Sequence, residues 1–154
     1  MLLAKIFKTL GIIFIVLALI LLWQRNNPKR LAFVELPAIK KQNNSQDNAP
    51  VRILIKDIGI DLPIIPAQIN KTAWETTTQG VSWISASPPP GEKGNSIIYG
   101  HNWTNLIGNI FRVKPGQEII IIAKNGSVKK FVVEKIAYVS AKNVSVLNQT
   151  NDQR

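Results

Sequence analysis

The sequence contains no cysteine, so it can form neither a disulfide framework nor a metal site built on thiolates. The same absence excludes a cysteine nucleophile among these 154 residues. Histidine is nearly as scarce. His101 is the sole one, and a zinc site would need carboxylates for nearly all of its ligands. We therefore expect no metal site and assign no cofactor.

Acidic residues are also few, with nine against 19 lysines and arginines, which gives a formal net charge of +10 at pH 7. Such a balance can indicate nucleic-acid binding. Here the lysines are scattered and an apolar segment comes first, so we interpret the charge as that of a basic exported domain held close to anionic lipid or wall polymer. We expect no nucleic-acid partner.

A long uncharged run lies near the amino terminus, from Thr9 to Gln24. At about 1.5 Å per residue it spans roughly 24 Å, a little less than the roughly 30 Å hydrocarbon core of a membrane. Lys5 and Lys8 precede it and can reach the lipid headgroups, while Trp23 is placed as an interfacial anchor. We predict a short basic head over residues 1–8 and a transmembrane signal anchor over residues 9–24.

A cleaved signal peptide is the competing interpretation of this run. Cleavage requires small residues after the apolar stretch, and Leu21–Arg25 provides none. Basic residues flank both ends of the run, so the positive-inside rule does not choose an orientation. A short head is typical of an anchor whose amino terminus lies inside the cell. We therefore expect a single-pass protein of the cell membrane with its carboxy-terminal domain outside the cytoplasm.

The remaining chain divides into a linker and one domain. Residues 25–50 begin basic and end in a polar stretch with almost nothing to bury, which is typical of a flexible tether. A short apolar patch within it, Leu31–Val34, can lie on the membrane surface or pack on the domain. Residues 51–154 are the only stretch able to bury a core, and their length is that of one small domain.

Strand signals dominate this domain from Val51 onward, and we count about six strands and two short helices. Asp61–Pro66 contains two prolines, which predicts an edge strand because proline cannot donate to a ladder. Thr72–Glu75 matches a capping box and predicts a short helix. Leu106–Phe111 predicts a helical turn. The pattern favours an all-β barrel or sandwich over an α/β sheet.

The strongest local prediction is a β-hairpin. Its arms are residues 116–124 and 127–139, and Asn125–Gly126 between them is typical of a tight turn. The second arm loses its alternation past Lys135, where we expect a bulge.

His101 is the one residue with catalytic chemistry in an unusual setting. A lone histidine is ordinarily structural or solvated, but this one follows Gly100 and the apolar run Asn95–Tyr99, where we expect a buried strand to end and expose side chains. No Gly-x-Ser-x-Gly elbow is present to make a serine the nucleophile. The serines at 82, 96 and 140 have no evident base either.

These motifs together resemble the first part of a sortase, a bacterial membrane-anchored cysteine transpeptidase. The matching segments keep the order and spacing found in that family: Gly80–Trp83, Pro90–Gly91, Gly94–Asn95, Ile97–His101, Phe111, Lys114–Ile119, the hairpin to Val139, Val144–Leu147 and Thr150. Asn102 departs from the arginine that many relatives carry after the histidine, which leaves the subclass open.

The resemblance implies an eight-stranded β-barrel outside the membrane that cuts surface proteins at a Leu-Pro-x-Thr-Gly sorting signal. A cysteine thiolate attacks the threonine carbonyl, and an amine of a cell-wall precursor or a pilin resolves the thioacyl enzyme. A histidine acts as general acid and an arginine stabilises the oxyanion. Of these groups only the histidine maps onto this sequence, at His101. The implied partners are the sorting-signal peptide, the acceptor amine and the membrane.

In the family the cysteine ends a strand of the Thr-Leu-x-Thr-Cys type, and the arginine lies on the next strand. This sequence stops near the point where the cysteine strand would begin. We therefore expect an incomplete, C-terminally truncated sortase-like barrel of about six of eight strands, inactive and prone to aggregate through its open edges. The alternatives are a non-catalytic domain that binds a peptide or wall component, and a membrane-tethered surface domain unrelated to sortases.

Overall fold

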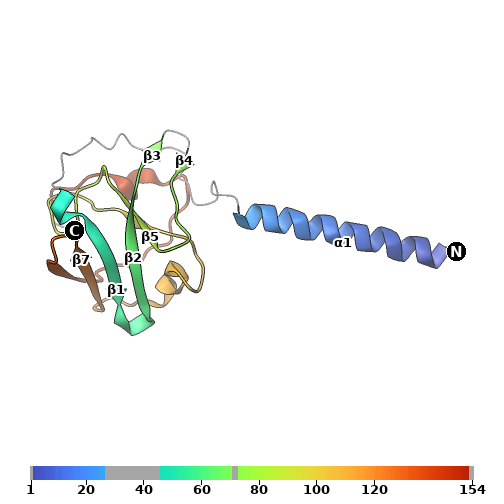
Figure 1. The fold of residues 1–154 in the computed structure, drawn as a ribbon, viewed down its shortest axis with the longest axis horizontal. Helices are drawn as coiled ribbons and strands as arrows, with labels where there is room; N and C mark the ends of the chain where they lie inside the picture. The colour runs from blue at the N-terminus through green and yellow to red at the C-terminus, as the bar shows by residue number, and fades with distance from the viewer. Residues whose placement is uncertain (1, 27–45, 71–72, 153–154) are drawn as a thin grey trace. The chain divides into compact units, whose positions relative to one another are not determined.

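The computed structural model describes residues 2–26, 46–70 and 73–152. The chain divides into two compact units, Met1–Arg30 and Leu31–Arg154. The first contains one long helix, and the second contains a curled β-sheet with the segments that cover it (Figure 1). Most of the predicted linker, including its apolar patch Leu31–Val34, lies outside the described residues.

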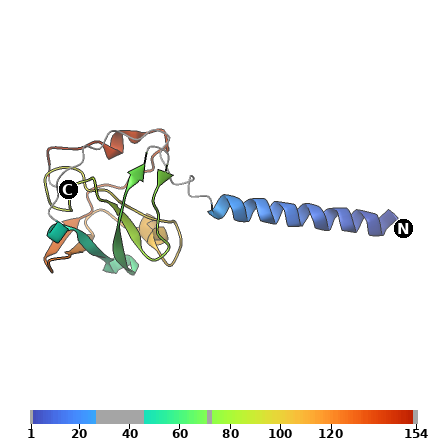
Figure 2. The ribbon, with the colours of Figure 1, turned by 45° about the horizontal axis from the view of Figure 1, so that its top comes forward.

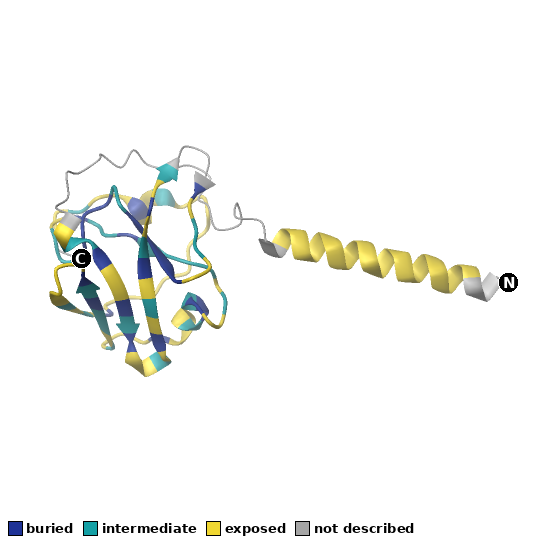
Figure 3. Cartoon of the chain, in the orientation of Figure 1, coloured by how far each residue is buried: buried dark blue, intermediate teal, exposed yellow. Residues whose placement is uncertain are grey.

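Helix α1 (Leu2–Asn26) contains the predicted anchor and extends beyond both of its ends. Its candidate membrane span is Lys5–Gln24, 20 residues with a mean hydropathy of 2.6. Every side chain of that span is exposed (Figure 3). A long helix with an apolar surface on all sides is typical of a segment surrounded by lipid. By length and composition α1 qualifies as a membrane anchor or as a signal sequence.

Six strands form one sheet that curls into a half-barrel (Figures 1 and 2). Their order is β6-β5-β2-β1-β7-β8, so β6 and β8 are the edge strands. The β2–β5 pair is parallel and the other neighbours are antiparallel. The strands are β1 (Pro50–Ile55), β2 (Ile60–Ala67), β5 (Val81–Ile84), β6 (Ile98–Tyr99), β7 (Glu118–Ala123) and β8 (Val128–Val132). The all-β class and the incomplete, six-stranded barrel are confirmed.

Short elements cover and connect the sheet. A two-stranded hairpin is formed by β3 (Ile69–Asn70) and β4 (Ala73–Trp74). The described residues also contain four 3₁₀-helices: η2 (Gln46–Asn48), η3 (Lys56–Ile58), η4 (Ile107–Arg112) and η5 (Val144–Leu147). The helical turn predicted at Leu106–Phe111 corresponds to η4.

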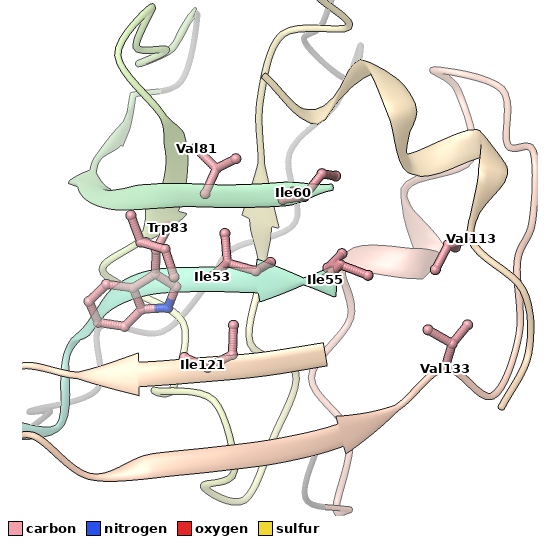
Figure 4. Close-up of a cluster of buried hydrophobic side chains, with 9 residues drawn as sticks. Ile53, Ile55, Ile60, Val81, Trp83, Val113, Ile121 and Val133 are labelled. Carbon is pink, nitrogen blue, oxygen red and sulfur yellow. The ribbon is translucent and has the colours of Figure 1, made fainter. Parts of the chain in front are cut away.

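The main hydrophobic core lies inside the curl of the sheet (Figure 4). Alternation along β1 places Ile53 and Ile55 on the inner face, while Leu54 between them is half-buried and Arg52 before them is exposed. The cluster consists of Ile53, Ile55, Ile60, Ile64, Val81, Trp83, Val113, Ile121 and Val133. Most of these side chains are β-branched and suit a pleated surface.

The prediction that Asp61–Pro66 forms an edge strand is wrong, because β2 lies in the middle of the sheet. The two neighbouring strands, β1 and β5, pair with different halves of β2. Pairing with β1 ends at Pro63, and pairing with β5 begins at Ile64. The Ser85 amide donates to the Ala67 carbonyl, so Ala67 faces β5 and its neighbour Pro66 faces the opposite side, where the β1 ladder has ended. Pro63 faces the β5 side beside Gly80, just before the β5 ladder begins. Neither proline therefore deprives a ladder of a donor.

The helix predicted from the capping box at Thr72–Glu75 is also absent, because Ala73–Trp74 is strand β4. The Glu75 carboxylate does bind a backbone amide, but the donor is Gln68 across the hairpin, at 2.8 Å. Trp74 is buried in a second core, and this burial outweighs the local helix signal. Thr72 itself lies outside the described residues.

The β7–β8 hairpin is confirmed, with a register from Glu118 opposite Val132 to Ile122 opposite Val128. Its turn is a three-residue loop in which Gly126 alone adopts the left-handed region, at φ 81°. Asn125 keeps a negative φ and accepts a hydrogen bond from the Ser127 amide at its side-chain oxygen. β8 ends at Val132 and residues 133–140 form no strand, so the bulge expected near Lys135 does not occur.

Candidate active site

His101 lies two residues beyond β6, at the end of an edge strand of the sheet. β6 pairs on one side with β5, with Ile98 opposite Trp83 and Tyr99 opposite Ser82. In the part of the chain that the structure describes, the outer edge of β6 has no strand partner. His101 is half-buried, so its imidazole is supported by the protein and still reaches solvent.

The imidazole of His101 stacks on the indole of Trp103. The ring centroids are 4.6 Å apart and the planes differ by 12°. The Trp103 carbonyl accepts hydrogen bonds from the amides of Leu106 and Gly108, both at 2.9 Å. A Cβ on Gly108 would lie 2.5 Å from that carbonyl oxygen, so the tight turn requires glycine there. The loop after the histidine is therefore a defined turn leading into η4.

Tyr99, the last residue of β6, attaches this strand to the β3–β4 hairpin. Its ring meets Trp74 edge to face, with centroids 4.8 Å apart and planes at 85°. Its hydroxyl donates to the Glu75 carbonyl. Burial raises the pKa of Tyr99 to about 12, a hydrogen bond with Ser82 opposes that rise, and the Glu75 charge adds to it. The phenol thus stays neutral at physiological pH and fastens the β3–β4 hairpin to the edge strand.

The segment leading into β6 is bound by the carboxy-terminal residues. The Asn95 side-chain amide donates to the carbonyls of Val146 and Asn148, at 2.9 and 3.2 Å. Asn95 also donates its backbone amide to Gln149 Oε1 at 3.0 Å, and the Gly94 amide donates to the Asp152 carbonyl at 2.8 Å. These bonds hold the last described residues beside the approach to the edge strand.

A second, smaller core lies beneath this contact. It consists of Trp74, Ile84, Ile97 and Leu147, with Tyr99 packed against it. Leu147 belongs to η5, so the carboxy-terminal segment contributes apolar burial as well as hydrogen bonds. The edge strand that carries the histidine is therefore fixed by three elements distant in sequence: β5, the β3–β4 hairpin and η5.

Two acidic side chains of the domain, Asp61 and Glu75, are engaged in other contacts. Asp61 forms a bidentate ion pair with Arg52, and both N–O distances are 2.7 Å. The Glu75 carboxylate accepts a hydrogen bond from the Gln68 amide. The Arg52 hydrogen bond lowers the pKa of Asp61 below its usual value. Within residues 2–26, 46–70 and 73–152, no cluster of three or more His, Cys, Asp or Glu side chains could hold a metal ion.

Among the described residues, no hydrogen bond joins His101 to the serines at 82, 96 and 140. Ser82 is buried on β5, opposite Tyr99, and Ser140 is exposed beyond β8. Sequence reasoning missed two features of the site: the stacking of Trp103 and the contact between Asn95 and Gln149. The available signal for the first was an aromatic residue two positions after the sole histidine, followed by a turn with Gly108.

The fold is an open, mostly antiparallel β-barrel domain with its single histidine at an edge strand, and comparison with known proteins assigns its family. The family profile described as the Sortase domain matches residues 53–154. This chain therefore belongs to the sortase family. Among solved structures, sortase A of Listeria monocytogenes matches with a TM-score of 0.57 and 21% sequence identity, over 70% of this chain and 72% of that one. That likeness concerns the fold. No curated protein sequence matches.

Proposed function

We propose that this chain carries the histidine side of a sortase-type transpeptidase site, with His101 as the general acid. The observation that carries the proposal is the placement of a half-buried imidazole at the end of edge strand β6 in a chain of the sortase family. When the peptide bond after the threonine of a sorting signal breaks, the departing amine needs a proton, and an imidazolium at this position supplies it.

The proposed reaction also needs a thiolate to attack the threonine carbonyl. The 154 residues contain no cysteine. A strand added along the open edge of β6 would bring its end beside His101, and the Gly94–Asp152 hydrogen bond holds the chain next to this edge. We therefore expect residues 1–154 to bind a sorting signal at His101 and not to cleave it by themselves.

The proposed setting is the outer face of a bacterial cell membrane. Helix α1 serves as the anchor, and the domain lies outside the cytoplasm, where surface proteins present their Leu-Pro-x-Thr-Gly signals. The amine that receives the cut protein belongs to a cell-wall precursor or a pilin subunit. This arrangement keeps enzyme, substrate and acceptor at one membrane surface.

The absence of cysteine favours a second candidate function, a non-catalytic membrane-anchored domain that binds a peptide or a wall component. Both functions place a peptide beside His101. They differ in whether the domain becomes catalytic when a thiolate-bearing strand is joined to it.

The proposal can be tested with the full chain in detergent micelles, because its sole histidine gives one set of imidazole NMR signals. A Leu-Pro-x-Thr-Gly peptide should shift those signals in a concentration-dependent way, and the peptide should remain uncut. A peptide of the same composition in scrambled order is the control. Unchanged imidazole signals at saturating peptide would overturn the proposal, and so would cleavage that disappears in His101→Ala, because our account requires an added thiolate.

A further inference from the structure

We propose that Trp103 is a positioning residue for His101, holding the imidazole by its face in the orientation that proton transfer requires. The functional part of this inference rests on the proposed role of His101 as general acid. The structural part rests on the geometry of the two rings and of the turn that carries the indole.

The stack constrains the imidazole without occupying its polar atoms. With the centroids 4.6 Å apart and the planes within 12°, the rings are in near-parallel contact. Such contact limits rotation of the imidazole about its side-chain bonds, while both ring nitrogens lie at the ring edge, away from the contact. Among the described residues no group hydrogen-bonds either nitrogen of His101. The ring edge therefore remains free for the reacting partners.

The indole is a firm support because its own backbone is fixed. The Trp103 carbonyl receives the amides of Leu106 and Gly108, and Leu106 is buried with 4% exposure. Gly108 permits the close approach because any Cβ there would overlap the Trp103 carbonyl. These backbone hydrogen bonds do not involve His101, so the turn that carries the indole is closed by contacts other than the stack.

Support by an aromatic face suits a group that must exchange a proton. A carboxylate bound to one ring nitrogen would favour one protonation state of the imidazole. An indole face accepts the neutral ring by stacking and the cationic ring by cation–π attraction. The same support therefore operates before and after the proton is transferred.

The test uses the full chain with labelled histidine and compares wild type with Trp103→Leu, Trp103→Phe and Phe111→Leu. Phe111 is 64% exposed on η4, the element that follows this turn, so its replacement removes an aromatic ring that is not stacked on the histidine. The indole ring current should move the His101 signals upfield in wild type. Trp103→Leu should lose this shift and increase the mobility of the imidazole, Trp103→Phe should keep a smaller upfield shift, and Phe111→Leu should match wild type.

Wild-type signals in Trp103→Leu would overturn the inference, because the indole would then not hold the imidazole. Loss of the shift in Trp103→Phe or Phe111→Leu as well would also contradict it, because the effect would then be general disruption. Adding the sorting-signal peptide separates the two proposals. If the upfield shift is present but the peptide does not move it, the proposed function fails while the support of His101 by Trp103 stands.

Discussion

Asn95 and Gln149 lie 54 positions apart in the sequence and bind each other reciprocally: the Asn95 amide donates to Gln149 Oε1, and Gln149 Nε2 donates to the Asn95 carbonyl. The Asn95 side chain adds bonds to the carbonyls of Val146 and Asn148. This contact joins the carboxy-terminal segment to the strand that ends at His101. This contact is therefore one of those that hold the edge of the sheet.

Replacing Asn95 with alanine removes both side-chain bonds and should lower the free energy of unfolding by about 1–2 kcal/mol. Amide hydrogen exchange should accelerate in residues 146–150, because their link to the edge strand is weakened. Asn148→Ala is the matched control, since it keeps the carbonyl that receives the Asn95 bond. Equal unfolding free energies and equal exchange in the two variants would show that the contact contributes nothing.

Tyr99 should ionise at unusually high pH. Its pKa is about 12, raised chiefly by burial, against an ordinary value of about 10. Because the folded value is the higher one, the stability that Tyr99 contributes is complete below pH about 10 and is lost as the pH rises through about 12. The Tyr138→Phe chain leaves Tyr99 as its only tyrosine, so the ultraviolet absorbance of phenolate reports on it alone. A midpoint near 10 while circular dichroism shows an intact fold would contradict this.

The Arg52–Asp61 pair should give a small acid dependence of stability. The Asp61 pKa is lowered by Arg52, so the contribution is present above the ordinary carboxyl pKa of about 3.9 and is lost as the pH falls through the lower folded value. Both side chains are about half exposed, and such pairs are weak and screened by salt. Thermal unfolding of wild type, Arg52→Met and Asp61→Asn at several pH values measures it. The acid loss should shrink in both variants and should diminish in high salt.

The sequence was sufficient to predict features that depend on local pattern. The apolar helix, the all-β class and the β7–β8 hairpin each follow from a run of residues whose periodicity reflects its own environment. His101 could be identified as a candidate because it is the sole histidine and follows an apolar run and a glycine.

Features that depend on distant partners could not be predicted in this way. The prolines of β2 are tolerated in a central strand because its two ladders meet at Pro63 and Ile64, and nothing local reveals that division. Trp74 became a strand residue because Ile84, Ile97 and Leu147 form a core around it. The support of His101 by Trp103 depends on a turn closed at Gly108, and a sequence pattern does not report ring stacking.

The central claim is our proposal that His101 acts as the general acid of a sortase-type site once the cysteine and arginine strands are joined to it. The most direct measurement joins the cysteine and arginine strands of Listeria monocytogenes sortase A to the carboxy terminus of this chain and follows cleavage of a Leu-Pro-x-Thr-Gly peptide. We predict cleavage by the chimera, and loss of at least about 100-fold in rate for its His101→Ala variant, the usual contribution of a general acid. A folded chimera that cleaves equally well without the imidazole, or that shows no cleavage although it binds the peptide, would contradict the claim.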